Sequence, residues 1–358
     1  MRRTAALIAG AGPAGCAAAI RLAAGGVQAV LVERSDGPRD VVCGGFLGWD
    51  ALAALRHLGL DAEALGARPI GRLRLVTGRA NFEAPLPHPA AGLSRRTLDA
   101  ALQETAAAAG AELLRGRSIR AADVGGRILR LDGGEELAGE SLILATGKHE
   151  LRGAGRKVDL AAAPLGLRAS VAGAADLGGM IELHLFDGGY SGVLLQEDGT
   201  ANLCLSVSRG RMKAAGGVDR LLAELGEEVP AFARRLEGGA LTAWSAVAGV
   251  PYGWRARDTV DGFYRVGDQA AVIASLAGDG VAIALESGIA AGDAVLSGQN
   301  APAYQTAFRR RARRPVGLAE GLRRAAEHSP TRGLLMPALR LFPGLAPAFA
   351  RLTRIGGG

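Results

Sequence analysis

The 358-residue sequence has few cysteines, few lysines and few aromatic side chains. Its three cysteines, Cys16, Cys43 and Cys204, form no CxxC pair, which argues against a zinc ribbon or a disulfide framework and fits a reducing compartment. No stretch reaches the roughly 18 consecutive apolar residues that a membrane span needs. From the cysteine spacing we expect no metal site. The length of the chain predicts about two domains.

Positive charge is concentrated at one end of the chain. The net charge is +7, but residues 301–358 alone hold 11 Arg, no Lys and 2 Glu, a net charge of +9. Residues 1–300 hold 31 basic and 33 acidic residues and are nearly neutral. Because no aromatic platform accompanies these arginines, we expect no nucleic-acid partner.

The basic segment 301–358 admits two interpretations. Its apolar positions between 334 and 352 predict helices that pack on the body of the protein, with the arginines in solvent. The alternative is peripheral contact with an anionic membrane or an acidic partner. The chain is accordingly predicted to be cytoplasmic, with peripheral membrane association as the open question.

The first forty residues form one sequence unit. The pattern predicts a buried strand at 5–9, a glycine turn at 10–15, a helix at 16–24 and a second buried strand at 28–32 followed by Glu33 and Arg34. This is the context that a dinucleotide-binding fingerprint requires. A signal peptide would share the basic start, but the glycines interrupt its apolar core.

Each residue of the glycine turn has a physical task. Gly10 permits the tight turn, Gly12 lets the backbone approach a pyrophosphate, and Gly15 lets the helix pack close to the strand. The helix that begins near Pro13 and Ala14 offers free N–H groups to phosphates, and Glu33 can accept hydrogen bonds from ribose hydroxyls. The fingerprint alone does not distinguish FAD from NAD.

Three later segments favour FAD. Arg95 opens a predicted helix that runs to about 109, where it can pair with a pyrophosphate. An apolar strand at 141–145 ends in Thr146-Gly147, small residues that suit a bound nucleotide. A strand at 262–266 ends in Gly267-Asp268, whose carboxylate can hold ribityl hydroxyls. The turn Gly278-Asp279-Gly280 then starts an Ala-rich helix, and its positive end stabilises negative charge on a flavin.

In this order of motifs the chain resembles the FAD-dependent oxidoreductases with the para-hydroxybenzoate hydroxylase fold. It is most similar to their geranylgeranyl-reductase-like branch and to the oxygenase-like flavoproteins found with polyketide synthases. The resemblance covers about residues 4–300. It implies FAD contacts at Gly10, Gly12, Ala14, Gly15, Glu33, Arg34, Arg95, Ile119, Gly267, Asp268 and Gly280. Their places in the same motifs add Pro13, Cys43, Gly44, Thr146, Gly147, Gly278 and Asp279 to the predicted cofactor contacts.

The predicted architecture is an α/β fold with three parts. A discontinuous Rossmann-type FAD-binding domain takes residues 1–154 and 261–300, a mixed β-sheet substrate domain takes 155–260, and basic C-terminal helices take 301–358. The predicted strands of the substrate domain are 164–171, 180–186, 190–196, 200–207 and 241–247, with a helix at 219–236. Such a sheet would roof the flavin ring and hold a lipophilic substrate.

The sequence departs from the family pattern at three places, one of which is the segment Lys148-His149-Glu150-Leu151-Arg152, which concentrates ionisable groups near the expected cofactor cleft. Thr146-Gly147 replaces the Asp-Gly pair of the hydroxylases, which puts direct reduction by NADPH in doubt and leaves room for a separate reductase. The Tyr-x-Trp-x-Phe-Pro segment of geranylgeranyl reductases keeps only Tyr190. The Trp-x-Trp-x-Ile-Pro segment of flavin-dependent tryptophan halogenases is absent, since Trp244 and Trp254 stand ten residues apart.

Three residues are candidates for catalysis. Cys43 lies in a Cys-Gly-Gly segment that, by resemblance, lies beside the flavin, although a small buried residue fits as well. His149 is a candidate for proton transfer or a surface-loop histidine, and Tyr190 is retained in the substrate sheet. His184 alternates with Glu182 and Phe186, so it faces either solvent or the pocket.

These observations predict an FAD-dependent oxidoreductase that acts on a lipophilic or aromatic, polyketide-like small molecule. Flavin monooxygenation is the leading prediction, and reduction of a carbon–carbon double bond is the alternative. A flavoprotein that only carries electrons to a biosynthetic complex is a third possibility. The reducing equivalents come from NAD(P)H or from a partner reductase.

Overall fold

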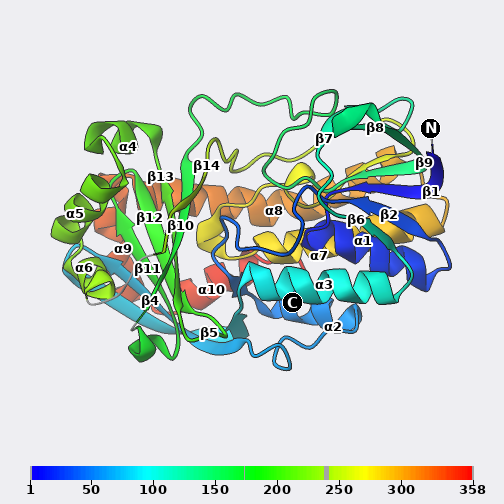
Figure 1. Ribbon diagram of the computed structural model, residues 1–358. Coiled ribbons are helices and arrows are strands. Elements are labelled where there is room, and N and C mark those ends of the chain that lie inside the picture. Colours follow the sequence, from blue (N-terminus) through cyan, green and yellow to red (C-terminus); the bar gives the residue numbers. More distant parts are fainter. Residues whose placement is uncertain (1, 173, 238–241, 357–358) are drawn as a thin grey trace.

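The chain folds around two β-sheets, which lie at opposite ends of the molecule and are joined by long helices (Figure 1). The computed structural model describes residues 2–172, 174–237 and 242–356. The predicted α/β class is confirmed, with helices and two sheets in one chain.

The first sheet carries the N-terminal strand. Its strands run in the order β6-β2-β1-β9-β8-β7, and β15 also pairs with β9. The central strands are parallel and buried on both faces, which explains their uninterrupted apolar sequences. The strands of this sheet are β1 (Arg2–Ala9), β2 (Ala29–Val32), β6 (Glu112–Leu114), β7 (Ile119–Asp123), β8 (Ile128–Leu131), β9 (Glu136–Leu144) and β15 (Phe263–Arg265).

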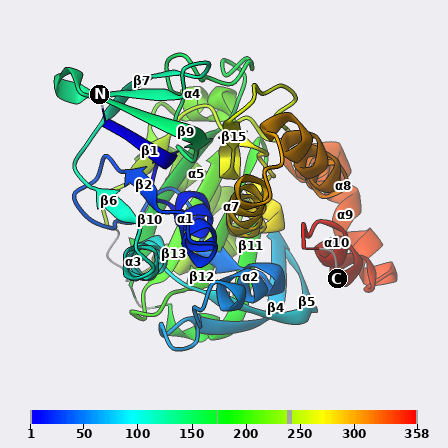
Figure 2. The same ribbon diagram turned by 90° about the vertical axis from the view of Figure 1, so that its right-hand side faces the viewer.

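Three helices pack together below this sheet (Figure 2). They are α1 (Pro13–Ala24), α3 (Arg95–Ala108) and α7 (Gly280–Leu296). The axes of α1 and α7 come close because α7 has glycine where a side chain would strike α1: a Cβ at Gly288 would overlap the Ala14 carbonyl, and one at Gly292 would lie 2.9 Å from the Arg21 Cβ. A shorter helix, α2 (Trp49–His57), packs against α7.

The second sheet has eight strands in the order β14-β10-β13-β12-β11-β4-β5-β3. All neighbours are antiparallel except β11 and β4. Its strands are β3 (Phe46–Leu47), β4 (Arg68–Thr77), β5 (Ala80–Gly92), β10 (Leu165–Val171), β11 (Gly179–Phe186), β12 (Gly189–Leu195), β13 (Ala201–Val207) and β14 (Ser245–Val247). The predicted strand at 241–247 is shorter than expected, and Leu241 lies outside the described residues.

Strands β3, β4 and β5 belong to this second sheet, although the sequence-based division placed residues 1–154 in the FAD-binding domain. The hairpin of β4 and β5 is joined by ion pairs from Arg72 and Arg74 to Glu83, with N–O distances of 2.5 and 2.7 Å. It then pairs in parallel with β11, about a hundred residues later in the chain. That pairing depends on tertiary structure, so local periodicity does not reveal it.

Helices α4 (Arg209–Ala215), α5 (Val218–Glu228) and α6 (Pro230–Leu236) cover the outer face of the second sheet (Figure 1). The helical segment predicted at 219–236 is confirmed, but Val229 divides it into two helices. Pro230 lacks an N–H and forces the preceding residue out of the helical region, and Val229 accordingly has φ −131° and ψ 83°. The remaining short turns are 3-10 helices at Asp132–Gly134, Ala175–Leu177, Gly267–Gln269 and Ser275–Ala277.

The C-terminal segment forms three helices along one side of the molecule (Figure 2). They are α8 (Ala301–Glu327), α9 (Ser329–Leu341) and α10 (Leu345–Leu352). Among the described residues, no single helix is long and apolar enough to cross a membrane. Helices α9 and α10 meet the length and composition criteria only together, and they are bent by 111° relative to each other.

Candidate functional site

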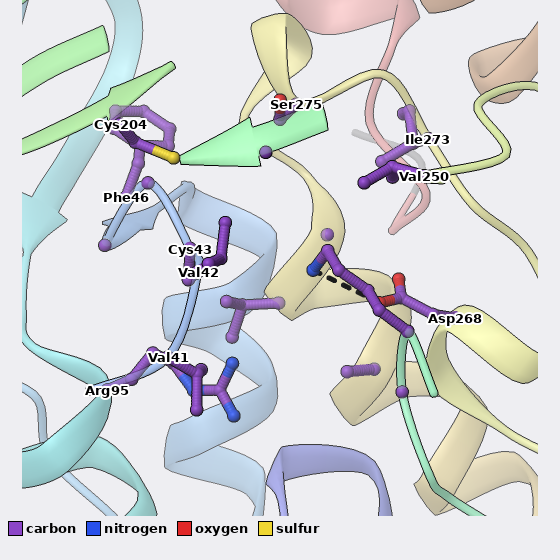
Figure 3. Close-up of a pocket in the computed structure, with 18 of the residues that line it drawn as sticks. Val41, Val42, Cys43, Phe46, Arg95, Cys204, Val250, Asp268, Ile273 and Ser275 are labelled. Atoms are coloured by element: carbon purple, nitrogen blue, oxygen red, sulfur yellow. Dashed lines mark ion pairs between the residues drawn. The ribbon is translucent and has the colours of Figure 1, made fainter. Parts of the chain in front are cut away.

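A cavity of about 860 Å³ runs between the two sheets. One end is lined by the glycine turn after β1, and the other end by β4, β11 and the C-terminal helices. Figure 3 shows part of its wall, with Cys43, Arg95, Cys204 and Asp268 contributed by separate segments of the chain. The cavity therefore connects the predicted nucleotide site with the predicted substrate sheet.

The glycine turn forms one end of this cavity. Gly10 has φ +105°, and a Cβ there would lie 2.6 Å from the Ala145 carbonyl oxygen, so only glycine fits. Pro13 occupies the first turn of α1, where its missing N–H costs nothing. Gly10, Gly12, Pro13 and Ala14 line the cavity, while Gly15 packs α1 against the turn. The uncapped N–H groups at the start of α1 are thus available to an anion.

Glu33 lies next to the glycine turn. One carboxylate oxygen accepts a hydrogen bond from the Ala11 N–H at 3.0 Å, and the other accepts one from the Ser35 N–H at 3.0 Å. Both Glu33 and Arg34 line the cavity. The carboxylate is therefore held at the end of β2, where the fingerprint predicts a ribose contact.

His149 lies close to this nucleotide end. Its Nε2 is 2.8 Å from Arg34 Nη2, and because a guanidinium only donates, the imidazole nitrogen accepts. Burial lowers the pKa of His149, and the Arg34 charge lowers it further. Its role as a proton donor near a flavin stays a prediction, and the structure gives this imidazole a neutral, arginine-paired state.

Arg95 stands at the start of α3 beside the glycine turn. Its guanidinium makes two hydrogen bonds of 2.8 Å to Asp99, and a Cβ on Gly12 would be 3.5 Å from its Nη2. Burial raises the pKa of Asp99, while Arg95 opposes that rise. The bidentate pair fixes a cationic group next to the free N–H groups of α1, a combination that suits a pyrophosphate. Ile119, the first residue of β7, also lines the cavity.

Lys148 and Asp268 form an ion pair on the cavity wall, with Nζ 3.3 Å from the carboxylate (Figure 3). Thr146 and Gly147 precede this lysine, and all three line the cavity together with Gly267. The Asp268 charge raises the pKa of Lys148. Sequence reasoning chose Asp268 but missed Lys148 as its partner. The position of Lys148 directly after Thr146-Gly147, in a chain with only three lysines, was the available signal.

In the turn before α7, the two glycines line the cavity, whereas the aspartate between them contacts the C-terminal segment. Gly278 and Gly280 line the cavity, but Asp279 is fully buried behind it. Its carboxylate accepts hydrogen bonds from Arg354 Nη1 at 3.0 Å and from the Ile355 N–H at 2.9 Å. The prediction that Asp279 contacts the cofactor is therefore corrected. A buried carboxylate needs a cation, and Arg354, just after the end of α10, supplies it.

The residues around the cavity leave room for an FAD molecule. Gly44, Gly147 and Gly280 all line the cavity, and a Cβ at any of them would meet no atom within 4 Å. A side chain at these positions would not clash with the protein itself but would project into the cavity, so glycine leaves that part of the cavity empty. The open backbone, the Arg95–Asp99 pair and the Lys148–Asp268 pair fit a cofactor with a pyrophosphate and a flat ring.

Cys43 lies between the nucleotide end and the second sheet. It is partly exposed and lines the cavity, and its carbonyl oxygen accepts a hydrogen bond of 2.9 Å from Asn202 Nδ2. Cys204 on β13 lines the same cavity (Figure 3), and burial raises its pKa to about 12. A chemical role for Cys43 stays a prediction.

Tyr190 contributes a hydroxyl group to the cavity. This hydroxyl is hydrogen-bonded to Ser275 Oγ and accepts the Leu276 N–H at 3.0 Å. Ser275 Oγ is in turn 2.8 Å from the Tyr252 hydroxyl. Burial raises the pKa of Tyr190, so the phenol stays protonated. Sequence reasoning missed Ser275 and Tyr252, because their contact with Tyr190 joins segments far apart in the chain.

The remainder of the second-sheet end is apolar. Alternate residues of β4 and β11 point into the cavity, and the inner sides of the C-terminal helices close it. The apolar lining comprises Leu73, Leu75, Leu86, Ile181, Leu183, Leu185, Leu276, Leu335, Leu339, Ala346 and Phe349. We call this part the apolar chamber.

His184 lies on the opposite face of β11. It is fully buried against Phe232 of α6, with ring centroids 5.6 Å apart. Its neighbour Glu182 is held by Arg235, with an N–O distance of 2.7 Å. Both sequence-based alternatives for His184, solvent and pocket, are therefore wrong, because helices α5 and α6 bury that face of the sheet.

Comparison with known proteins agrees with this geometry. Residues 3–130 match the FAD binding domain family, so the chain contains an FAD-binding domain. The predicted resemblance to flavoproteins of the para-hydroxybenzoate hydroxylase fold is confirmed.

Individual relatives come from several flavoprotein groups. The chain is 34% identical over 157 residues to a menaquinone reductase of Mycolicibacterium smegmatis, a match that spans 41% of this chain and 38% of that protein. Its fold is similar to that of the flavin-dependent brominase Bmp2, with a TM-score of 0.81, 19% identity and coverage of 99% and 94% of the two chains. It is also similar to a geranylgeranyl bacteriochlorophyll reductase-like protein from Thermoplasma acidophilum, with a TM-score of 0.71, 20% identity and coverage of 87% and 83%.

Proposed function

We propose that this chain is an FAD-dependent oxidoreductase that reduces a carbon–carbon double bond in a lipophilic small molecule such as a prenylated quinone. The observation that carries this proposal is the continuous cavity, which joins the FAD-binding end to the apolar chamber. An elongated apolar substrate can occupy the chamber while its reacting carbon lies next to the cofactor.

Successive groups along the cavity would hold successive parts of FAD. The start of α1 and Arg95 would hold the pyrophosphate, and Glu33 would hold the adenosine ribose. Asp268 and Lys148 would face the ribityl and ring portion, next to the open glycines. When bound and reduced by two electrons, the flavin would supply the hydride that the reduction requires and return to oxidised FAD.

The hydroxyl groups at the boundary of the chamber give the site its polar contacts. Tyr190 Oη, Ser275 Oγ and Tyr252 Oη form a connected chain. Such a chain can hold a proton at Tyr190 Oη or donate a hydrogen bond to a ring oxygen of a quinone or phenol. The leucines around it exclude water, so a substrate is oriented by these few polar atoms.

Reduction is favoured over the monooxygenation that the sequence favoured. The similarity to a menaquinone reductase, at 34% identity, supports reduction, whereas the similarity to the brominase is at 19% identity and concerns the fold alone. Oxygenation of a phenolic substrate is the second candidate, because the hydroxyl chain also fits a phenolate oxygen. An electron carrier fits less well, because it needs no chamber of this kind.

The test is a single-turnover reaction of the purified FAD-bound protein with an unsaturated prenylated naphthoquinone. The protein is reduced chemically under anaerobic conditions, mixed with substrate, and the product is reoxidised in air before mass spectrometry. The proposal predicts a gain of two hydrogens that survives reoxidation, since a reduced quinone ring returns to the quinone but a saturated tail does not. Unchanged substrate would contradict the proposal, and a gain of one oxygen in an aerobic reaction would favour the second candidate.

The source of electrons needs a separate measurement on the same FAD-bound protein. We propose a separate reductase as the partner, because Thr146-Gly147 replaces the Asp-Gly pair of the hydroxylases. Addition of NADPH alone should then leave the visible flavin absorbance unchanged for many turnover times. Rapid bleaching by NADPH would instead assign reduction to NADPH directly.

A further inference from the structure

The C-terminal helices carry an exposed apolar surface. In the part of the chain that the structure describes, six large hydrophobic side chains are exposed, and five of them lie on α9, on α10 or in the turn between them. They are Leu334, Leu341, Phe342, Leu345 and Leu352. We call these five residues the hairpin surface. The sixth, Val260, lies elsewhere in the fold.

The hairpin surface lies on the outer side of these helices, and the opposite side packs against the second sheet. Arg332, Met336 and Leu339 recur at helical spacing on α9 and are buried, while Leu334 and Leu341 face outward with 70% and 72% of their surface exposed. The inner side contacts β4, β5 and β11 through a shared cluster that includes Leu75 and Leu183. Helix α9 is thus apolar on two sides, and residues 2–172, 174–237 and 242–356 cover only one of them.

Charge around the hairpin surface has one sign. Residues 328–356 contain four Arg and no Asp or Glu. Arg340 and Arg351 are exposed, and within the described residues neither makes an ion pair. The adjoining helix α8 adds Arg310 and Arg314, which are likewise exposed and unpaired in the described part. Apolar side chains bordered by unpaired arginines match an interface between lipid tails and anionic headgroups.

The same two helices form a wall of the apolar chamber. Leu335, Leu339 and Phe349 line the cavity from the inner side of the hairpin. A helix with its side chains is about 10 Å thick, so a bilayer that touches the hairpin surface is separated from the chamber by roughly one helix. Figure 2 shows α8, α9 and α10 together on the side of the molecule that this contact would use.

We propose that the α9–α10 hairpin docks the protein on an anionic lipid bilayer through Leu334, Leu341, Phe342, Leu345 and Leu352, with Arg340 and Arg351 on the headgroups. The hairpin would lie on the bilayer surface and would not cross the bilayer, because its inner side packs against the second sheet. This inference does not depend on the proposed reaction, and vesicle binding can be measured without any substrate.

The test uses the full-length FAD-bound protein and flotation with two kinds of vesicle, phosphatidylcholine alone and phosphatidylcholine with phosphatidylglycerol. We expect binding to the anionic vesicles that weakens with salt. The double variant Leu341→Ser, Phe342→Ser should reduce that binding by at least about tenfold. Replacing Arg340 or Arg351 with Gln should reduce it by about fivefold each.

Two controls separate docking from misfolding. Val260→Ser removes the exposed hydrophobic residue outside the hairpin and should leave vesicle binding unchanged. Every variant should keep the visible flavin absorbance and the unfolding temperature of the parent protein. Equal binding of parent and double variant would overturn the proposal. A dimer that forms in the parent, disappears in the double variant and coincides with no vesicle binding would assign this surface to a second copy instead.

Discussion

The two ends of the cavity are built in different ways. The FAD-binding end is formed largely by backbone: the turn at Gly10, the start of α1 and the glycines Gly147 and Gly280. The chamber end is formed by side chains from β4, β11, β12 and the C-terminal helices. The shape of the FAD-binding end depends on the absence of side chains, and the shape of the chamber depends on the size of its side chains.

This difference has a consequence for substitution. A backbone-lined site tolerates almost no added atom, because a bound cofactor would need the space that a Cβ would take. A site lined by leucines can change its volume by one residue at a time while the fold is kept. We therefore expect the chamber to determine which substrate is used, and the glycines to determine whether any chemistry occurs.

The largest expected effect comes from filling the backbone-lined end. A Cβ at Gly280 meets no protein atom within 4 Å, so Gly280→Leu should fold normally and place its side chain in the cavity. We expect the FAD affinity to fall by at least about a thousandfold, or about 4 kcal/mol. Titration of the FAD-free protein with FAD, followed by flavin fluorescence, measures this change.

The matched control is Gly321→Leu. Gly321 is also helical and exposed, and a Cβ there likewise meets nothing within 4 Å, but it does not line the cavity. Its FAD affinity should equal that of the parent. If both variants bind FAD equally well, the cavity does not hold the cofactor at the start of α7.

The next effect concerns Arg354, which ties the C-terminus to the FAD-binding end. Its guanidinium donates to Asp279 at 3.0 Å and lies 4.6 Å from the centre of the Trp49 ring, and its side chain is 4% exposed. Removing the cation with Arg354→Met leaves a buried carboxylate without its partner, which should lower the free energy of unfolding by about 3 kcal/mol. Urea denaturation measures this loss.

Arg351→Met is the control for the previous variant. Arg351 precedes the same turn but is exposed, so its loss should change stability by less than about 0.5 kcal/mol. Adding Asp279→Asn to Arg354→Met should recover part of the lost stability, because the unpaired charge is then gone. Without such recovery, the ion pair would not be the reason for the destabilisation.

The comparison between the two ends also separates what the sequence predicts from what it does not. Gly10, Gly12, Glu33 and Asp268 all line the cavity, because a strand, a turn and a helix in close succession define their positions. The partners of these residues come from distant segments. Lys148 faces Asp268 and Arg354 faces Asp279 only because the fold brings them together.

The chamber was the harder part to predict for the same reason. Strands β4 and β5 read as part of the first domain, since nothing local indicates that β4 pairs with β11. The Tyr190 hydroxyl chain likewise depends on Ser275, which lies 85 positions later in the sequence. Spacing within one segment is readable from sequence, whereas pairing between segments requires the tertiary structure.

The smallest expected effect tests whether the chamber selects the substrate. Leu335 and Leu334 are neighbours on α9, but Leu335 lines the chamber while Leu334 is exposed on the hairpin surface. Leu335→Trp should reduce chamber volume and lower kcat/KM for a prenylated quinone by about tenfold, or about 1.4 kcal/mol. FAD affinity should not change, because α9 is remote from the glycine turn. Leu334→Trp adds the same atoms on the outer side, so its kcat/KM with detergent-solubilised substrate should match the parent. A loss of FAD affinity in Leu335→Trp would show that the two ends of the cavity are not independent, and equal activity losses in both variants would show that chamber volume does not select the substrate.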